Sequence, residues 1–108
     1  MPKKKLQIFD DVWKEMKRKH VDEWEPTEKD ERWLIETVDE LKVGGLWYFP
    51  AAGATFEKVG ADHLKLRSIE TDDPLDAMIH IEKTKKVGKK AGIKVDTEET
   101  AEHIFFQL

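Results

Sequence analysis

The sequence predicts a single α+β domain over residues 1–108, in which helices pack on one small, antiparallel-dominated sheet. Three observations lead to this fold class. Apolar residues before residue 42 recur at helical spacing, residues 46–69 alternate like strands between two small-residue turns, and helix-start signals return after residue 71. The predicted order is ααβββαβα, and the lysine-rich residues 1–5 are expected to form a flexible basic tail.

The composition limits the class of protein. A chain of 108 residues can bury one modest core. Charged residues make up 39% of it, but both signs are interleaved and aromatic residues supply core material, which favours a solvated surface over disorder. The absence of cysteine excludes a disulfide scaffold, a thiolate metal site and a cysteine nucleophile.

The composition also indicates a cellular setting. No apolar run is long enough to span a membrane, and no apolar segment follows the basic start as in a signal peptide, so we expect a cytoplasmic protein. The chain has no asparagine and is rich in lysine and glutamate, which is typical of thermophilic proteins. In composition alone it resembles small archaeal proteins from hot environments.

Two amphipathic helices are predicted first. Residues 6–21 carry one apolar stripe: Ile8, Phe9, Val12, Trp13 and Met16. Pro26 interrupts the helical pattern, Thr27 is a good N-cap, and a second helix should run to about Lys42. Its stripe is Trp33, Leu34, Val38 and Leu41. Gly44 is the expected left-handed residue at its end.

Three short strands, 46–50, 54–59 and 63–69, are predicted to form a meander with three-residue turns. This register pairs Pro50 with Ala54 and Val59 with His63, and it needs a positive φ at Gly53. One face would then hold Leu46, Tyr48, Phe56, Leu64 and Leu66. The other would hold Trp47, Phe49, Thr55, Glu57, Lys65 and Arg67, with Glu57 opposite Lys65.

The last third is predicted to be mostly helical. Asp73 and Pro74 start a helix that Gly92 ends, although residues 78–82 alternate like a strand. Residues 93–95 indicate a brief strand. A terminal helix from Asp96 to Leu108 is favoured by the stripe Ala101, Ile104, Phe105 and Leu108, and an edge strand over 102–108 is the alternative.

Two sets of residues are candidate binding sites. The first is an aromatic and basic sheet face that could stack a nucleic-acid base and hold its phosphates: Trp47, Phe49, His63, Lys65 and Arg67. The alternative is that helices cover this face. The second is one side of the predicted helix, where a local basic block could attract an anion, an RNA or an acidic partner: Lys83, Lys86 and Lys90. Its alternative is a solvated helix end, and the scarcity of arginine counts against specific nucleic-acid readout.

Two carboxylate–histidine pairs at i, i+4 spacing could act as acid and base: Asp76 with His80, and Glu99 with His103. Two such groups specify little, so we predict no catalytic residue, no metal site and no cofactor. The sequence favours a small non-enzymatic binding or assembly domain whose partner is a second copy of itself or another protein. A nucleic-acid-binding module and a small-molecule enzyme are the alternatives.

Overall fold

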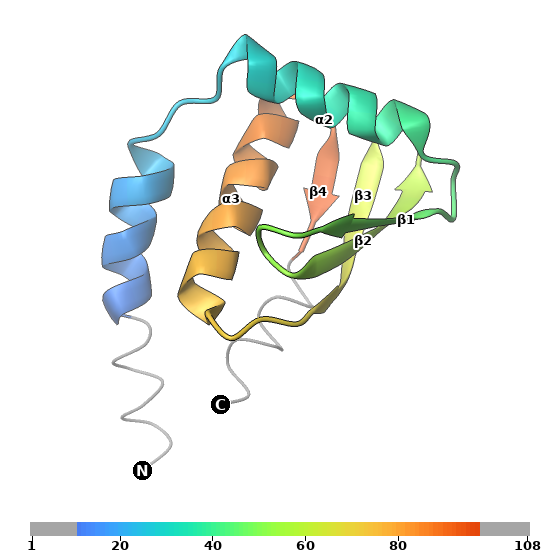
Figure 1. The fold of residues 1–108 in the computed structure, drawn as a ribbon. Helices are drawn as coiled ribbons and strands as arrows, with labels where there is room; N and C mark the ends of the chain where they lie inside the picture. Colours follow the sequence, from blue (N-terminus) through green and yellow to red (C-terminus); the bar gives the residue numbers. More distant parts are fainter. Residues whose placement is uncertain (1–10, 98–108) are drawn as a thin grey trace.

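The computed structural model describes residues 11–97. The predicted terminal helix, its strand alternative and the Glu99–His103 pair lie outside these residues, apart from the first two positions of that helix. Within the described part, helices pack on a four-stranded mixed sheet of order β1-β2-β3-β4, which confirms the α+β class (Figure 1). Strands β1 to β3 are antiparallel neighbours, and β4 is parallel to β3.

The described part of the first predicted helix is helical. Residues 11–17 are α-helical and continue into a π-helical turn, η1 (Arg18–Asp22), in which the Glu23 N–H donates to the Arg18 carbonyl at 3.2 Å. Trp13 and Val21 are buried. Arg18 donates to Glu15 at 2.7 Å, and this hydrogen bond, with the charge attraction, lowers the pKa of Glu15. In Figure 1 this helical segment lies beside α3.

Helix α2 (Glu28–Glu40) begins as predicted and ends differently. Thr27 and Asp30 form a capping box, in which the Asp30 N–H donates to the Thr27 hydroxyl at 3.3 Å. The helix ends at Glu40. Gly44 has a positive φ of 89°, but it lies in the turn before β1, so its predicted role as the helix-ending residue is wrong.

A buried lysine from the sheet satisfies the end of α2 instead. The Nζ atom of Lys58 donates to the carbonyls of Val38 and Leu41, each at 2.8 Å. These carbonyls lie at the C-terminal end of the helix, where regular i+4 partners are missing, and the Val38 carbonyl also accepts from the Leu41 N–H at 3.1 Å. The backbone of Lys58 also bonds Gly44 and Gly45 and so holds the chain that enters β1.

The predicted register of β1 (Leu46–Phe49) against β2 (Ala54–Gly60) is wrong by one residue. Phe49 pairs with Ala54 and Trp47 with Phe56, so the loop between the strands has four residues. A slip of one residue moves every side chain of a strand to the other face. Trp47 therefore stacks on Phe56 on the core face, with ring centroids 5.4 Å apart, and burial of these rings stabilises the observed register.

The predicted pairing of Glu57 with Lys65, between β2 and β3 (His63–Ile69), is confirmed. The turn is not the predicted one, because Gly60 pairs with His63 and the loop has two residues. An irregularity between Lys58 and Gly60 absorbs the extra residue, Val59, and gives the predicted register from Lys58 to Phe56. A second irregularity, between Thr55 and Phe56, pairs Thr55 with Ser68 instead of the predicted Arg67.

Helix α3 (Pro74–Ala91) is continuous, which confirms helix over residues 78–82. Asp73 caps it by accepting from the Asp76 N–H at 3.1 Å, and Gly92 ends it with a φ of 78°. Strand β4 (Lys94–Asp96) follows at once, one residue later than the predicted 93–95. Because β4 is parallel to β3, the long connection through α3 returns to the edge of the sheet.

The core lies between one face of the sheet and helices α2 and α3. Its fully buried side chains are Phe56, Leu34, Leu64, Leu66, Ile81 and Val38. Each contributes roughly 1.5–3 kcal/mol by leaving water. In Figure 1, α2 runs across the strands and α3 stands beside them. Within residues 11–97, no helix is long and apolar enough to cross a membrane.

Candidate functional site

The aromatic and basic residues of the predicted platform lie on opposite faces of the sheet. Trp47 and Phe49 face the core side, where they are half-buried. His63, Lys65 and Arg67 alternate with buried Leu64 and Leu66 and so point to the opposite face. The prediction that the aromatic and basic residues share one face is therefore wrong, because the register of β1 differs by one residue from the predicted register.

The aromatic half of that platform packs within the fold. Trp33 of α2 contacts Trp47 and Phe49 of β1, with ring centroids 5.6 and 5.7 Å apart. Phe49 also meets His80 of α3 edge-on at 6.2 Å. This cluster joins β1 to both helices, so its rings are held by packing rather than presented as a flat stacking surface.

The basic half of the platform is partly paired. Arg67 donates to Glu57 at 2.9 Å across β2 and β3. The Nε2 atom of His63 is buried, and it lies 3.8 Å from Asp96, too far for a hydrogen bond. These side chains form part of a mixed-charge face that no described helix covers.

The lysines predicted as a basic block bind the molecule's own backbone. The Nζ atom of Lys86 donates to the Val21 and Asp22 carbonyls at 2.8 and 3.2 Å, and also to the carbonyl of Trp24. These oxygens lie at and just after the end of the first helical segment, where the Val21 carbonyl also accepts from the Trp24 N–H at 3.1 Å. The sequence stripe predicted the shared helix side but not this contact.

The two other lysines of that side contact the same joint. Lys83 lies 5.2 Å above the Trp24 ring, and the Nζ atom of Lys90 is 3.5 Å from the Pro26 carbonyl. Together with Lys86 they join α3 to the chain between η1 and α2. Their side chains contribute packing and hydrogen bonds there as well as charge.

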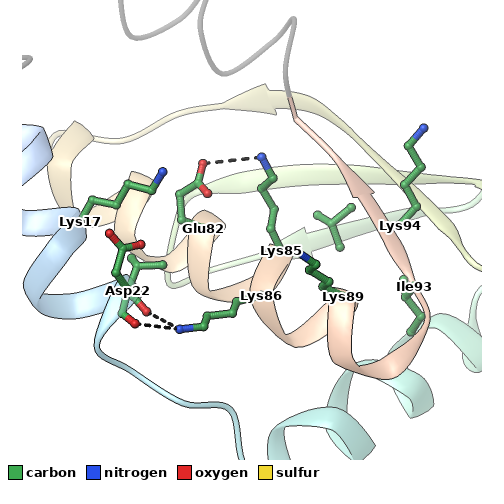
Figure 2. Close-up of a pocket in the computed structure, with 10 residues that line it drawn as sticks. Lys17, Asp22, Glu82, Lys85, Lys86, Lys89, Ile93 and Lys94 are labelled. Carbon is green, nitrogen blue, oxygen red and sulfur yellow. Dashed lines mark hydrogen bonds and ion pairs between the residues drawn. The ribbon is translucent and has the colours of Figure 1, made fainter.

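A second group of lysines surrounds an open pocket of about 450 Å³ between η1, α3 and β4 (Figure 2). Its charged lining consists of Lys17, Asp22, Glu82, Lys85, Lys86, Lys89 and Lys94, and its apolar lining consists of Val21, Ile93 and Val95. Figure 2 shows Lys86 turned towards backbone oxygens and Lys85 paired with Glu82, at 3.7 Å. Sequence reasoning missed this site because its lysines come from three elements.

The strand edge at β1 is the most apolar exposed feature of the described residues. Leu46 and Tyr48, on the uncovered face, are 63% and 59% exposed. Val43, just before the strand, is 66% exposed, and Trp33 on the helix side is 40% exposed. Scattered exposed apolar residues are ordinary, but these four lie in or beside one strand.

Asp76 and His80 come together as their spacing predicts, with Oδ2 and Nε2 3.6 Å apart. Neither lines the pocket in Figure 2 or the smaller one beside Pro26. Among residues 11–97, no group of three or more histidine or carboxylate side chains is placed to hold a metal ion. The pair is an ordinary surface contact on a helix.

Comparisons with models of known families, with curated proteins and with solved structures find no match to this chain. Its function is therefore inferred from the chemistry of the two surfaces above, the β1 edge and the lysine pocket.

Proposed function

We propose that the protein is a small non-enzymatic assembly domain that forms a homodimer by pairing the β1 strands of two copies. The observation that supports it most is the character of β1, Leu-Trp-Tyr-Phe, an edge strand with no charged residue. An edge strand presents unpaired backbone N–H and C=O groups, and natural proteins usually guard such an edge with charge.

The opposite edge of the same sheet has that protection. Strand β4 has only three residues, and two of them, Lys94 and Asp96, are charged. A second strand that paired with β4 would have to accommodate those charges beside its own side chains. The contrast favours β1 as the edge used for association.

A two-fold axis through Trp47 makes the β1 edge complementary to itself. In an antiparallel pair centred on this residue, Leu46 of each copy lies opposite Tyr48 of the other, on the same face of the joined sheet. Aromatic–aliphatic pairs across strands contribute roughly 0.2–1 kcal/mol each. Both side chains are exposed in the single chain, so pairing removes apolar surface from water.

The expected strength of this association is modest. Stable dimers bury about 1,200–2,000 Å² in total. An interface made by a four-residue strand with Val43 and Trp33 beside it would bury an area at the small end of that range. We expect a dimer that dissociates on dilution through the micromolar range.

The decisive experiment measures molar mass by size-exclusion chromatography with light scattering over that range. The variant Leu46→Lys/Tyr48→Lys should be monomeric at every concentration at which the wild type is a dimer. The matched control is Val12→Lys/Ile35→Lys, which replaces two other exposed apolar residues and should leave association unchanged. Circular dichroism establishes that each variant is folded. A monomeric wild type, or equal loss of association in the control, would refute the proposal.

No geometry among the described residues favours the nucleic-acid or enzyme alternatives. The aromatic and basic residues of the predicted platform lie on opposite sheet faces, and Asp76 and His80 line neither pocket. The composition supports a cytoplasmic, thermophilic setting as part of the proposal, and a midpoint of thermal unfolding well above the mesophilic range would agree with it.

A further inference from the structure

The pocket in Figure 2 gathers cations from parts of the chain that are distant in sequence. Lys17 comes from the first helical segment, Lys85 and Lys89 from α3, and Lys94 from β4. Residues 82, 85 and 89 are spaced so that they share one side of α3, and β4 lies against that helix. The fold therefore concentrates positive charge that the linear sequence disperses.

Most of this charge is not neutralised by the protein. Within residues 11–97, no carboxylate lies within ion-pair distance of Lys17, Lys89 or Lys94. The described lining of the pocket has five lysines against the two carboxylates of Asp22 and Glu82, in a chain whose net charge is −4. Like charges held close together repel, and an anionic ligand would relieve that repulsion.

The apolar lining indicates what kind of anion fits. Val21, Ile93 and Val95 line the pocket as aliphatic residues, and each keeps only a small exposed area, so the base of the pocket is a narrow non-polar patch. Lysine ammonium groups are point charges that suit phosphate oxygens. Among the described residues, no aromatic ring lines the pocket, so this part of the chain provides no stacking surface there for a nucleobase.

The size of the pocket agrees with a small ligand, since small-molecule sites occupy about 300–1,000 Å³. We propose that this pocket binds a phosphorylated small molecule with at least two negative charges and a sugar-like or aliphatic body. Its phosphates lie among Lys17, Lys85 and Lys89, and its body lies against Ile93. Lys94, whose ammonium group extends away from the other lysines in Figure 2, adds positive charge at the rim. The proposal does not depend on dimerisation, because β1 lies at the opposite edge of the sheet from β4.

The test is isothermal titration calorimetry at low salt with two probes, inorganic pyrophosphate and fructose 1,6-bisphosphate. We expect both to bind, the bisphosphate more tightly because its sugar contacts the apolar lining, and the affinity to fall as salt is added. Lys89→Glu/Lys94→Glu should weaken binding of the bisphosphate by about tenfold or more. Amide shifts in an NMR titration should be largest at Lys85, Lys89 and Val95.

The control variant Lys29→Glu/Lys42→Glu changes the net charge by the same amount at exposed lysines outside the pocket. It should weaken binding by less than about twofold, because those charges are distant and screened. Equal weakening by both variants, no binding of either probe at millimolar concentration, or tighter binding of a single-stranded oligonucleotide than of the bisphosphate would each overturn the proposal. Thermal unfolding monitored by circular dichroism shows that both variants retain the fold.

Discussion

Strands β1 and β4 lie at opposite edges of one sheet and differ in almost every property that governs pairing. β1 has four uncharged residues, two of them large and more than half exposed. β4 has three residues, and Lys94 and Asp96 carry opposite charges. The charged edge also contributes Lys94 to the anion pocket, so one residue both discourages strand pairing and attracts a ligand. In our proposals, one edge of the sheet therefore pairs with a second copy and the other contributes to the binding of a small anion.

The loop that positions β1 should be the most sensitive feature of this arrangement. Gly53 has a φ of 60°, and a Cβ atom there would lie 2.1 Å from the Glu70 carbonyl oxygen. We expect Gly53→Ala to lower the free energy of unfolding by about 3 kcal/mol, because it adds backbone strain and a steric clash. Urea denaturation followed by tryptophan fluorescence measures the change.

The control for that variant is Gly44→Ala, at the other end of β1. Gly44 also has a positive φ, 89°, but nothing lies within 4 Å of a Cβ atom there. Its cost should be only the strain of the left-handed conformation, about 1 kcal/mol. Equal costs for the two variants would show that the contact with Glu70 is unimportant.

The next effect is expected at Lys58, which holds both the end of α2 and the chain entering β1. Lys58→Met keeps much of the side-chain length and removes the donor. The Leu41 carbonyl then loses its side-chain partner, and the Val38 carbonyl keeps only its bond from the Leu41 N–H. We expect a loss of about 2 kcal/mol in the free energy of unfolding.

The matched substitution for Lys58 is Lys42→Met, at an exposed lysine just after the end of α2. It should change stability by less than about 0.5 kcal/mol. Chemical denaturation of both variants in parallel gives the comparison, and a Lys58→Met protein as stable as the control would contradict the assigned hydrogen bonds.

A third prediction concerns the charged side chain of Lys94, which should discourage strand pairing at the β4 edge. In the background of Leu46→Lys/Tyr48→Lys, the added substitution Lys94→Leu should produce weak association, visible by analytical ultracentrifugation only at the highest concentrations. Lys89→Leu in the same background makes the same chemical change away from the sheet edge. It should leave the protein monomeric. Equal association of both variants would indicate nonspecific hydrophobic association rather than pairing at the β4 edge.

The smallest effect is expected on the uncovered sheet face, at the ion pair between Arg67 and Glu57, where Nε and Oε1 are 2.9 Å apart. Arg67→Met should cost less than about 1 kcal/mol because both side chains are solvated. High salt should abolish the difference. Arg32→Met, at an exposed arginine on α2, should have no salt-dependent effect in the same denaturation experiment.

The features that local chemistry controls could be predicted from the sequence. The Thr27 cap and the end of α3 at Gly92 depend on neighbouring residues, and both are observed. The helical course of residues 78–82 agrees with the start signal at Asp73 rather than with local alternation. The positive φ at Gly53 was predictable, because the turn requires it.

The face of β1 could not be predicted in the same way. A three-residue loop after Pro50 and a four-residue loop after Phe49 are both compatible with the local sequence, and they place Trp47 on opposite sides of the sheet. Contacts from α2 and β2 decide between them, because Trp33 and Phe56 both pack on Trp47. Such contacts join residues far apart in the chain, and periodicity carries no information about them.

The sequence by itself therefore determined the α+β class, the order of the described elements and the uncharged character of β1. The tertiary structure decided which lysines bind the protein's own carbonyls and which surround an open pocket. Lys58 and Lys86 donate to backbone carbonyls at helix ends, whereas Lys89 and Lys94 meet no carboxylate within the described residues. The physical reason is that the environment of a charge depends on the groups that folding brings near it, and these come from elements that are distant in sequence.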